Sequence, residues 1–168
     1  SGSGNVAIYA VEKLQALGGK AVTISDSSGY VVDEAGIDLD LLKQVKEVER
    51  GRVADYVARR PGAKLVADGS VWDVPVDVAL PCATQNELDD KDAATLLKNG
   101  CVAVSEGANM PSTPKAVEAF QAAGILYGPA RRGLRRLRDR RIRRIRPGDP
   151  GRHGGHGGPR HPFEEPEL

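Results

Sequence analysis

A glycine-rich turn at the start of the chain constrains the fold more than any other feature. Residues 1–7 read Ser-Gly-Ser-Gly-Asn-Val-Ala, so Gly2, Gly4 and Ala7 have the spacing of a phosphate-binding turn between a strand and a helix. Gly2 allows a tight turn, Gly4 lets the backbone approach a pyrophosphate, and Ala7 lets the helix pack on a sheet. The free N–H groups at the start of that helix suit an anion. Taken alone, these residues fit an ordinary strand-to-helix turn equally well.

Short apolar segments alternate with helical ones after this turn. The predicted strands are residues 20–25, 64–67, 76–81, 101–105 and 125–127, and the predicted helices are residues 6–17, 39–56, 90–98 and 114–123. No hairpin signal interrupts the alternation, which is typical of α/β proteins. Residues 1–130 are therefore predicted to form a Rossmann-like doubly wound, mostly parallel sheet. A turn of this kind follows a buried strand, so we expect the chain to be a fragment that lacks its first strand.

Asp26 follows the predicted strand of residues 20–25, which is the second strand of a dinucleotide-binding fold when the missing first strand is counted, and the adenosine ribose binds at the end of that strand. A carboxylate there binds the 2′-hydroxyl and favours NAD. The hydroxyl and N–H groups of Ser27 and Ser28 could instead hold a 2′-phosphate if Asp26 turns away. The composition of residues 26–29 also fits a simple turn. Lys46 could reach back to a phosphate, although the charged residues around it have the pattern of a solvated helix face.

Polar loops follow two later strands, at the edge of the sheet where ligands bind in such folds. In these loops Thr84, Gln85 and Asn109 are positioned to hydrogen-bond ribose or nicotinamide. Thr84 or Asn86 could also cap the helix of residues 90–98. Cys82 is not expected to act as a nucleophile, because residues 1–130 contain no His that could activate it.

The charge of the chain is divided unevenly. Residues 1–130 contain 12 basic and 18 acidic side chains, a net charge of −6, whereas residues 131–168 contain 12 Arg and 5 acidic side chains, a net charge of +7. In residues 131–146 Arg pairs alternate with Leu or Ile, so this segment could be a basic amphipathic helix that contacts nucleic acid or an anionic membrane. We favour an accidental basic tail, and we expect residues 147–168 to be disordered.

The two cysteines, Cys82 and Cys101, lack the spacing of metal ligands, and no metal site is expected. The sequence contains no secretory signal and no apolar run that could span a membrane. We therefore expect a cytoplasmic protein with reduced thiols.

Five sequence blocks give residues 1–130 a resemblance to the coenzyme-binding domain of NADP-dependent glutamate dehydrogenases. The blocks are Gly2-Ser3-Gly4-Asn5-Val6-Ala7, Asp26-Ser27-Ser28-Gly29, Gly51-Arg52-Val53-Ala54-Asp55-Tyr56, residues 79–88 (Ala-Leu-Pro-Cys-Ala-Thr-Gln-Asn-Glu-Leu) and residues 106–111 (Glu-Gly-Ala-Asn-Met-Pro). The resemblance implies reversible conversion of L-glutamate to 2-oxoglutarate and ammonia, with NADP, and less readily NAD, as the hydride carrier. It also implies a homo-oligomeric protein.

The resemblance assigns roles to individual residues. It implies that Asn5 contacts the coenzyme, in a turn whose Gly2, Ser3, Gly4 and Val6 are the other candidate contacts. It also implies that Ser27 and Lys46 lie around the 2′-phosphate and that Ala83, Thr84 and Asn109 line the nicotinamide. This favours NADP over NAD at Asp26. The catalytic Lys and Asp of the family belong to a substrate domain that is absent here, so we predict no turnover from this chain alone.

The resemblance ends near Ala130. The family continues there with a Lys-Ala-Ala-Asn-Ala-Gly-Gly helix, whereas this chain continues with Arg131-Arg132-Gly133-Leu134. We interpret residues 131–168 as the product of a shifted reading frame or a damaged gene copy. Two alternatives remain at this point: a non-catalytic, basic-tailed protein that binds nucleic acid, and a non-functional fragment that neither folds nor binds.

Overall fold

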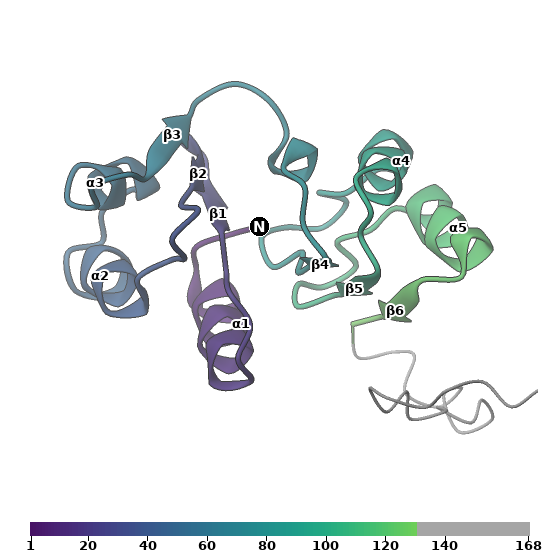
Figure 1. Cartoon of the computed structure of the whole chain (residues 1–168), viewed down its shortest axis with the longest axis horizontal. Helices are drawn as coiled ribbons and strands as arrows, with labels where there is room; N and C mark the ends of the chain where they lie inside the picture. The colour runs from purple at the N-terminus through teal and green to yellow at the C-terminus, as the bar shows by residue number, and fades with distance from the viewer. Residues whose placement is uncertain (131–168) are drawn as a thin grey trace, which may run out of the picture. The chain divides into compact units, whose positions relative to one another are not determined.

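The computed structural model describes residues 1–130, which form two three-stranded sheets with helices packed on them (Figure 1). The first sheet is antiparallel, with strand order β1-β2-β3, and the second is parallel, with strand order β4-β5-β6. The elements are α1 (Asn5–Ala16), β1 (Thr23–Asp26), β2 (Gly29–Val32), α2 (Leu39–Lys43), η1 (Gln44–Val48), α3 (Val53–Val57), β3 (Lys64–Val66), η2 (Val71–Asp73), β4 (Val78–Ala79), α4 (Asp90–Lys98), β5 (Ala103–Ser105), α5 (Pro114–Ala123) and β6 (Leu126–Gly128). The protein is therefore a mixed α/β protein with one parallel sheet.

Both predictions for the tail, a basic helix at 131–146 and disorder at 147–168, lie outside the described residues.

Each sheet has its own hydrophobic core. The first core joins α1, β1, β2 and the helices between β2 and β3; its largest fully buried side chains are Tyr56, Ile8, Ile24, Leu42, Val31, Val45 and Val53. The second core lies under α4 and α5 and contains Trp72, Leu88, Leu96, Val104 and Phe120. Burial of each such side chain contributes about 1.5–3 kcal/mol, so these two cores are the main source of stability in the described residues.

Two helices of the second half begin and end where the sequence predicts. Helix α5 begins after Thr113, whose hydroxyl accepts the N–H of Ala116, and ends at Gly124 with φ +72°. Helix α4 has the predicted bounds, but its N-cap is Asp89, which accepts the N–H groups of Lys91 and Asp92. The prediction of Thr84 or Asn86 as this cap is wrong. Leu88 forms a β-bridge with Ser112, so the chain is still extended after Thr84 and Asn86, and the helix begins only after Asp89.

Strands β1 and β2 form a hairpin that the sequence analysis missed. Asp26 pairs with Gly29 across a two-residue loop of Ser27 and Ser28. Gly29 has φ +126°, and a Cβ there would lie 2.3 Å from the carbonyl oxygen of Val66 on β3. Only glycine fits where the hairpin turn passes this close to β3. The turn therefore depends on a strand that lies far along the chain. The prediction of uninterrupted strand–helix alternation is therefore wrong in the first half.

The predicted helix of residues 39–56 is broken into α2, the π-helical turn η1, and α3. The break follows Val48, where Arg50 has φ +55° and the N–H of Gly51 donates to the carbonyl of Val45 at 2.8 Å. A π-helical turn widens the helix and redirects its side chains, and such turns often occur at functional sites. Here the turn carries Lys46.

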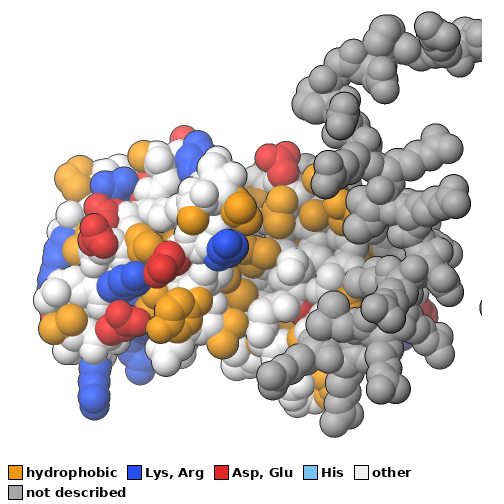
Figure 2. Space-filling view, turned by 90° about the horizontal axis from the view of Figure 1, so that it is seen from below, with side chains coloured by type: hydrophobic (Ala, Val, Ile, Leu, Met, Phe, Trp, Pro, Cys, Tyr) orange, Lys and Arg blue, Asp and Glu red, His pale blue; other side chains and the backbone are white. Residues whose placement is uncertain are grey.

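The surface of the described residues carries mixed charge. On the face in Figure 2, basic and acidic side chains are interspersed with apolar ones. One such pair joins Lys43 of α2 to Glu12 of α1, with 2.6 Å between Nζ and Oε2. No helix within residues 1–130 combines the length and the apolar character needed to cross a membrane.

Candidate functional site

The glycine-rich turn lies between the carboxyl ends of β1 and β4 (Figure 1). The N–H of Gly2 donates to Ser25 Oγ at 2.8 Å, and the amino group of Ser1 donates to the carbonyl of Leu80 at 2.9 Å. Gly2 has φ +80°, and a Cβ there would lie 2.9 Å from the carbonyl oxygen of Cys82. The turn is thus fixed to both sheets by its backbone.

The next part of the turn leaves the start of α1 open. Gly4 is the N-cap of α1 with extended backbone, and no side chain caps the helix. A Cβ at Gly4 would have no heavy atom within 4 Å, whereas Ser3 is buried and Asn5 is exposed. A ligand can therefore approach the backbone at Gly4 and the first N–H groups of α1, where anions are stabilised.

A pocket joins this turn to η1. Its volume is about 370 Å³, and it is lined by Ser3, Gly4, Asn5, Ile8, Lys46, Glu47 and Arg50. Four of the predicted site residues therefore share one pocket, although Lys46 is more than 40 positions away from the turn in sequence. Lys46 belongs to the π-helical turn η1, so this turn forms one wall of the pocket.

Asp26, at the tip of the β1–β2 hairpin, is saturated by protein donors. Its Oδ1 accepts the N–H and the hydroxyl of Ser28 at 2.8 and 2.5 Å, and its Oδ2 accepts Lys46 Nζ at 3.2 Å and the N–H of Val53 at 3.0 Å. Burial by itself raises the pKa of this carboxyl group, but the hydrogen bonds from Ser28, Val53 and Lys46 outweigh it and lower the pKa. Asp26 is thus ionised, and its oxygens are occupied.

Ser27 is the other predicted residue at the hairpin tip. Its Oγ accepts a hydrogen bond from Arg52 Nη1 at 2.6 Å. Lys46 also donates to the carbonyl of Gly51 at 2.9 Å, so an ammonium and a guanidinium group flank the same hairpin tip. Neither Arg52 nor Arg50 was among the predicted site residues, because the charges of residues 43–52 have the pattern of a solvated helix face. The available signal was the position of Arg52 inside the 51–56 block.

The polar loops after β4 and β5 lie side by side. The N–H of Asn86 donates to the carbonyl of Met110 at 3.0 Å, and the N–H of Gly107 donates to the carbonyl of Pro81 at 2.9 Å. A Cβ at Gly107 would lie 2.6 Å from Cys82 Sγ and 3.0 Å from Val6 Cγ1, so this glycine permits a close approach between the loop, β4 and the start of α1.

The predicted site residues therefore fall into two groups. Ser3, Gly4, Asn5 and Lys46 share the pocket, and Asp26 is joined to it through Lys46. Ala83, Thr84, Gln85 and Asn109 are exposed on the loops after β4 and β5 and do not line that pocket. Ser1 and Gly2 lie between the two groups, since the N–H of Cys82 donates to Ser1 Oγ at 3.1 Å and the N–H of Gly2 donates to Ser25 Oγ at 2.8 Å.

Cys82 has the properties of a buried structural thiol. It is 6% exposed, and burial raises the pKa of its thiol above the ordinary value. Cys101 is also a buried free cysteine, and burial likewise raises its pKa. Neither group is a thiolate at neutral pH, so neither is suited to nucleophilic attack.

The sequence of the chain matches one enzyme family. Residues 1–132 match the family described as glutamate/leucine/phenylalanine/valine dehydrogenase. The chain belongs to this family, whose members are oxidoreductases.

The individual relatives reported below are all glutamate dehydrogenases. A glutamate dehydrogenase of Bacteroides thetaiotaomicron is 54% identical over 134 residues, which are 78% of this chain and 30% of that protein. The NADP-specific glutamate dehydrogenase of Escherichia coli is 52% identical over 134 residues, with the same coverage. Among solved structures, a Plasmodium falciparum glutamate dehydrogenase aligns with a TM-score of 0.73 and 46% identity over 76% of this chain and 28% of that one. The chain thus spans about a third of the length of these relatives.

Proposed function

We propose that residues 1–130 are the coenzyme-binding domain of an NADP-dependent glutamate dehydrogenase, with a Rossmann-like fold. The observation that carries this proposal is the pocket in which the glycine-rich turn faces Lys46, with Asp26 already saturated by Ser28, Val53 and Lys46. A saturated carboxylate has little capacity left for the 2′-hydroxyl of NAD. The family match to residue 132 supports the domain boundary, and the NADP-specific relatives support the choice of coenzyme.

The described residues fit a coenzyme with an additional phosphate. The open side of Gly4 and the start of α1 would hold the pyrophosphate. Ser27, Lys46 and Arg52 would hold the 2′-phosphate, because a hydroxyl, an ammonium and a guanidinium group around one anion give strong charge-assisted hydrogen bonds. Ala83, Thr84, Gln85 and Asn109 would lie along the nicotinamide half.

In the whole protein, the reaction would be the oxidative deamination of L-glutamate, which consumes one water and gives 2-oxoglutarate and ammonia, and bound NADP would supply the hydride chemistry. The residues of this chain would bind and orient the coenzyme, and a substrate domain would supply the groups that hold glutamate. We further propose that the whole protein is a cytoplasmic homo-oligomer and that this chain alone has no turnover.

The test is a titration of the full 168-residue chain with NADP and with NAD. The variants Lys46→Ala and Arg52→Ala are each expected to weaken NADP binding about tenfold or more, because each loses a charge-assisted bond to the 2′-phosphate. Binding of NAD should change less than twofold. The matched control is Lys43→Ala, which removes the same charge from α2, where Lys43 forms an exposed pair with Glu12 of α1. Equal losses for both coenzymes, or no loss for either, would contradict the proposed roles.

A further inference from the structure

The two polar loops at the carboxyl ends of β4 and β5 each contain one residue in an unusual backbone conformation. Among the non-glycine residues of the described chain, 1–130, three have positive φ: Arg50, Asn86 and Met110. Asn86, with φ +56°, lies in the loop after β4, and Met110, with φ +48°, lies in the loop after β5. Asparagine tolerates positive φ, whereas a residue that precedes a proline, as Met110 precedes Pro111, normally has extended backbone with negative φ. The surrounding structure must therefore impose this conformation on Met110.

Asn86 and Met110 are bonded to each other through their main chains. The N–H of Asn86 donates to the carbonyl of Met110 at 3.0 Å. Directly after this bond, the N–H of Leu88 donates to the carbonyl of Pro111 at 3.0 Å, and Leu88 forms a parallel bridge with Ser112. Leu88 is fully buried in the second core, whereas Met110 is 50% exposed. Main-chain bonds, and not packing of its side chain, therefore hold Met110 in its conformation.

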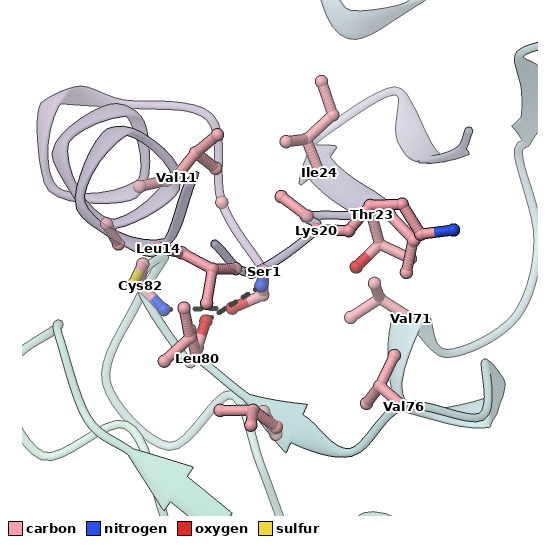
Figure 3. A pocket seen from close by; sticks show the side chains of 18 of the residues that line it. Ser1, Val11, Leu14, Lys20, Thr23, Ile24, Val71, Val76, Leu80 and Cys82 are labelled. Atoms are coloured by element: carbon pink, nitrogen blue, oxygen red, sulfur yellow. Dashed lines mark hydrogen bonds between the residues drawn. The ribbon is translucent and has the colours of Figure 1, made fainter. Parts of the chain in front are cut away.

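A second set of bonds joins the two loops where they leave the sheet. The N–H groups of Gly107 and Ala108 donate to the carbonyl of Pro81 at 2.9 and 3.0 Å. Beside it, Ser1 and Cys82 lie together at one end of an apolar pocket, where the N–H of Cys82 donates to Ser1 Oγ (Figure 3). The base of both loops is thus fixed to the glycine-rich turn.

The two sets of bonds close a ring of backbone. Between them the loop after β4 contributes residues 82–85, and the loop after β5 contributes residues 108–109. The ring contains all four residues predicted on the nicotinamide side, and all four are exposed: Ala83, Thr84, Gln85 and Asn109. Gln85 directly precedes Asn86, and Asn109 directly precedes Met110. The bond between Asn86 and Met110 therefore fixes the exposed residues of one loop relative to those of the other.

Glu87 attaches the far end of the ring to the second core. Its carbonyl accepts the indole Nε1–H of Trp72 at 3.2 Å, and its Oε1 accepts the N–H of Ala83 at 2.8 Å. Trp72 is 5% exposed and is the single tryptophan of the chain. Its fluorescence therefore reports on the attachment of the ring.

We propose that Asn86 and Met110 are positioning residues, whose shared bond holds the exposed side chains of the ring in one arrangement that recognises the nicotinamide half of the coenzyme. This inference rests on the proposed function, which places the nicotinamide along these two loops. Asn86 acts through its main-chain N–H and Met110 through its main-chain carbonyl. Because the ring is ordered before the coenzyme arrives, less conformational entropy is lost on binding.

The test without ligand compares Asn86→Gly with Asn86→Val in the full chain. Both variants remove the asparagine side chain, but glycine adopts positive φ readily and valine does not. Asn86→Val is expected to speed amide exchange at Leu88 at least about tenfold, whereas Asn86→Gly should stay within about threefold of the parent chain. Exchange at Leu96 in α4 should be unchanged in both variants. The emission of Trp72 should shift to longer wavelength in Asn86→Val alone.

The test with ligand compares NADP with adenosine 2′,5′-bisphosphate, which carries the 2′-phosphate but has no nicotinamide. Asn86→Val is expected to weaken NADP binding about tenfold and binding of the bisphosphate less than about twofold, because only NADP reaches the ring. Asn86→Gly should keep both affinities within about threefold of the parent chain. A purely structural role would weaken both ligands equally.

Each failure has a separate meaning. Unchanged exchange at Leu88 in Asn86→Val would overturn the bond as the element that orders the ring. Equal losses for the two ligands, or equal behaviour of the glycine and valine variants, would overturn the positioning role. If the parent chain binds neither ligand, the proposed function fails and the positioning role with it, whereas exchange still tests the bond between the loops. Should Asn86→Val not fold, Asn86→Ala takes its place, because alanine also disfavours positive φ in a smaller side chain.

Discussion

The two ends of the β1–β2 hairpin each hold an aspartate, and the two serve different purposes. Asp33, at the base, is 1% exposed and accepts Tyr56 OH at 3.0 Å and Arg60 Nε at 2.9 Å. Asp26, at the tip, also has protein partners, but one of them is Lys46, which lines the pocket at the glycine-rich turn. The base therefore stabilises the fold, whereas we propose that the tip binds coenzyme. Both carboxylates have their oxygens occupied, so this property does not distinguish a structural role from a role in binding. What distinguishes Asp26 is the pocket next to it.

The largest expected effect is at the base of the hairpin. Asp33→Ala removes the buried acceptor of Tyr56 and Arg60, and we expect the free energy of unfolding to fall by about 3–5 kcal/mol. Urea unfolding measures this change. The control is Glu49→Ala, which breaks the exposed pair with Arg59 and should leave the midpoint nearly unchanged. A similar small change for Asp33→Ala would contradict the structural role of the base.

The next effect is a loss of stability at high pH that depends on Tyr56. Burial raises the pKa of Tyr56 to about 12, and the hydrogen bond to Asp33 adds to this rise. Because the folded pKa is higher than the unfolded one, the stabilisation is complete below about pH 10 and is lost as the pH rises through about 12. The loss corresponds to about 2–3 kcal/mol. Tyr56→Phe should remove this part of the pH dependence of unfolding.

Two variants in the glycine-rich turn, at Gly2 and Gly4, separate a structural role from a role in coenzyme binding. Gly2→Ala places a Cβ 2.9 Å from the carbonyl oxygen of Cys82 at φ +80°, so we expect a loss of about 1–3 kcal/mol in unfolding free energy. Gly4→Ala has open space and extended backbone, so its stability should stay within about 0.5 kcal/mol. Its NADP affinity should nevertheless fall, because the new methyl group lies where we place the pyrophosphate. Thermal melts and coenzyme titrations of both variants separate the two effects.

The smallest expected effect is at the tip of the hairpin, at low pH. Hydrogen bonds from Ser28, Val53 and Lys46 outweigh burial and lower the pKa of Asp26, so its contribution is complete above the ordinary pKa of an aspartate. It is lost as the pH falls through the lowered pKa. Asp26→Asn should flatten the acid limb of the stability curve by less than Tyr56→Phe flattens the alkaline limb. An unchanged acid limb would show that the tip is not held by this carboxylate.

The sequence predicted the elements whose signals are local. Helix α5 has its cap, its proline and its terminal glycine within residues 113–124, and the bounds of α4 were predicted as observed. The hairpin was missed because its glycine is required by Val66, far along the chain. The break after Val48 was missed because a π-helical turn leaves no periodic signal in so short a helix.

The composition of the candidate site was harder to predict than its location. The motif at residues 2–7 predicted a pocket at the start of α1, and the structure brings Ser3, Gly4 and Asn5 together with Lys46, whereas the loops after β4 and β5 do not line this pocket. The sequence alone left Asp26 open between two coenzymes, because the donors that occupy it lie up to 27 positions away. Arg52 was not predicted as a site residue. Its contact with Ser27 depends on the β1–β2 hairpin, which was not predicted either.

The most direct test of the coenzyme assignment is a pair of dissociation constants, for NADP and for NAD, measured by calorimetric titration of the full chain at one ionic strength. The cations at the hairpin tip and the occupied oxygens of Asp26 predict that NADP binds at least about tenfold more tightly, since one charge-assisted bond contributes about 1.5–3 kcal/mol. Equal constants, tighter binding of NAD, or no saturable binding of either would contradict the assignment.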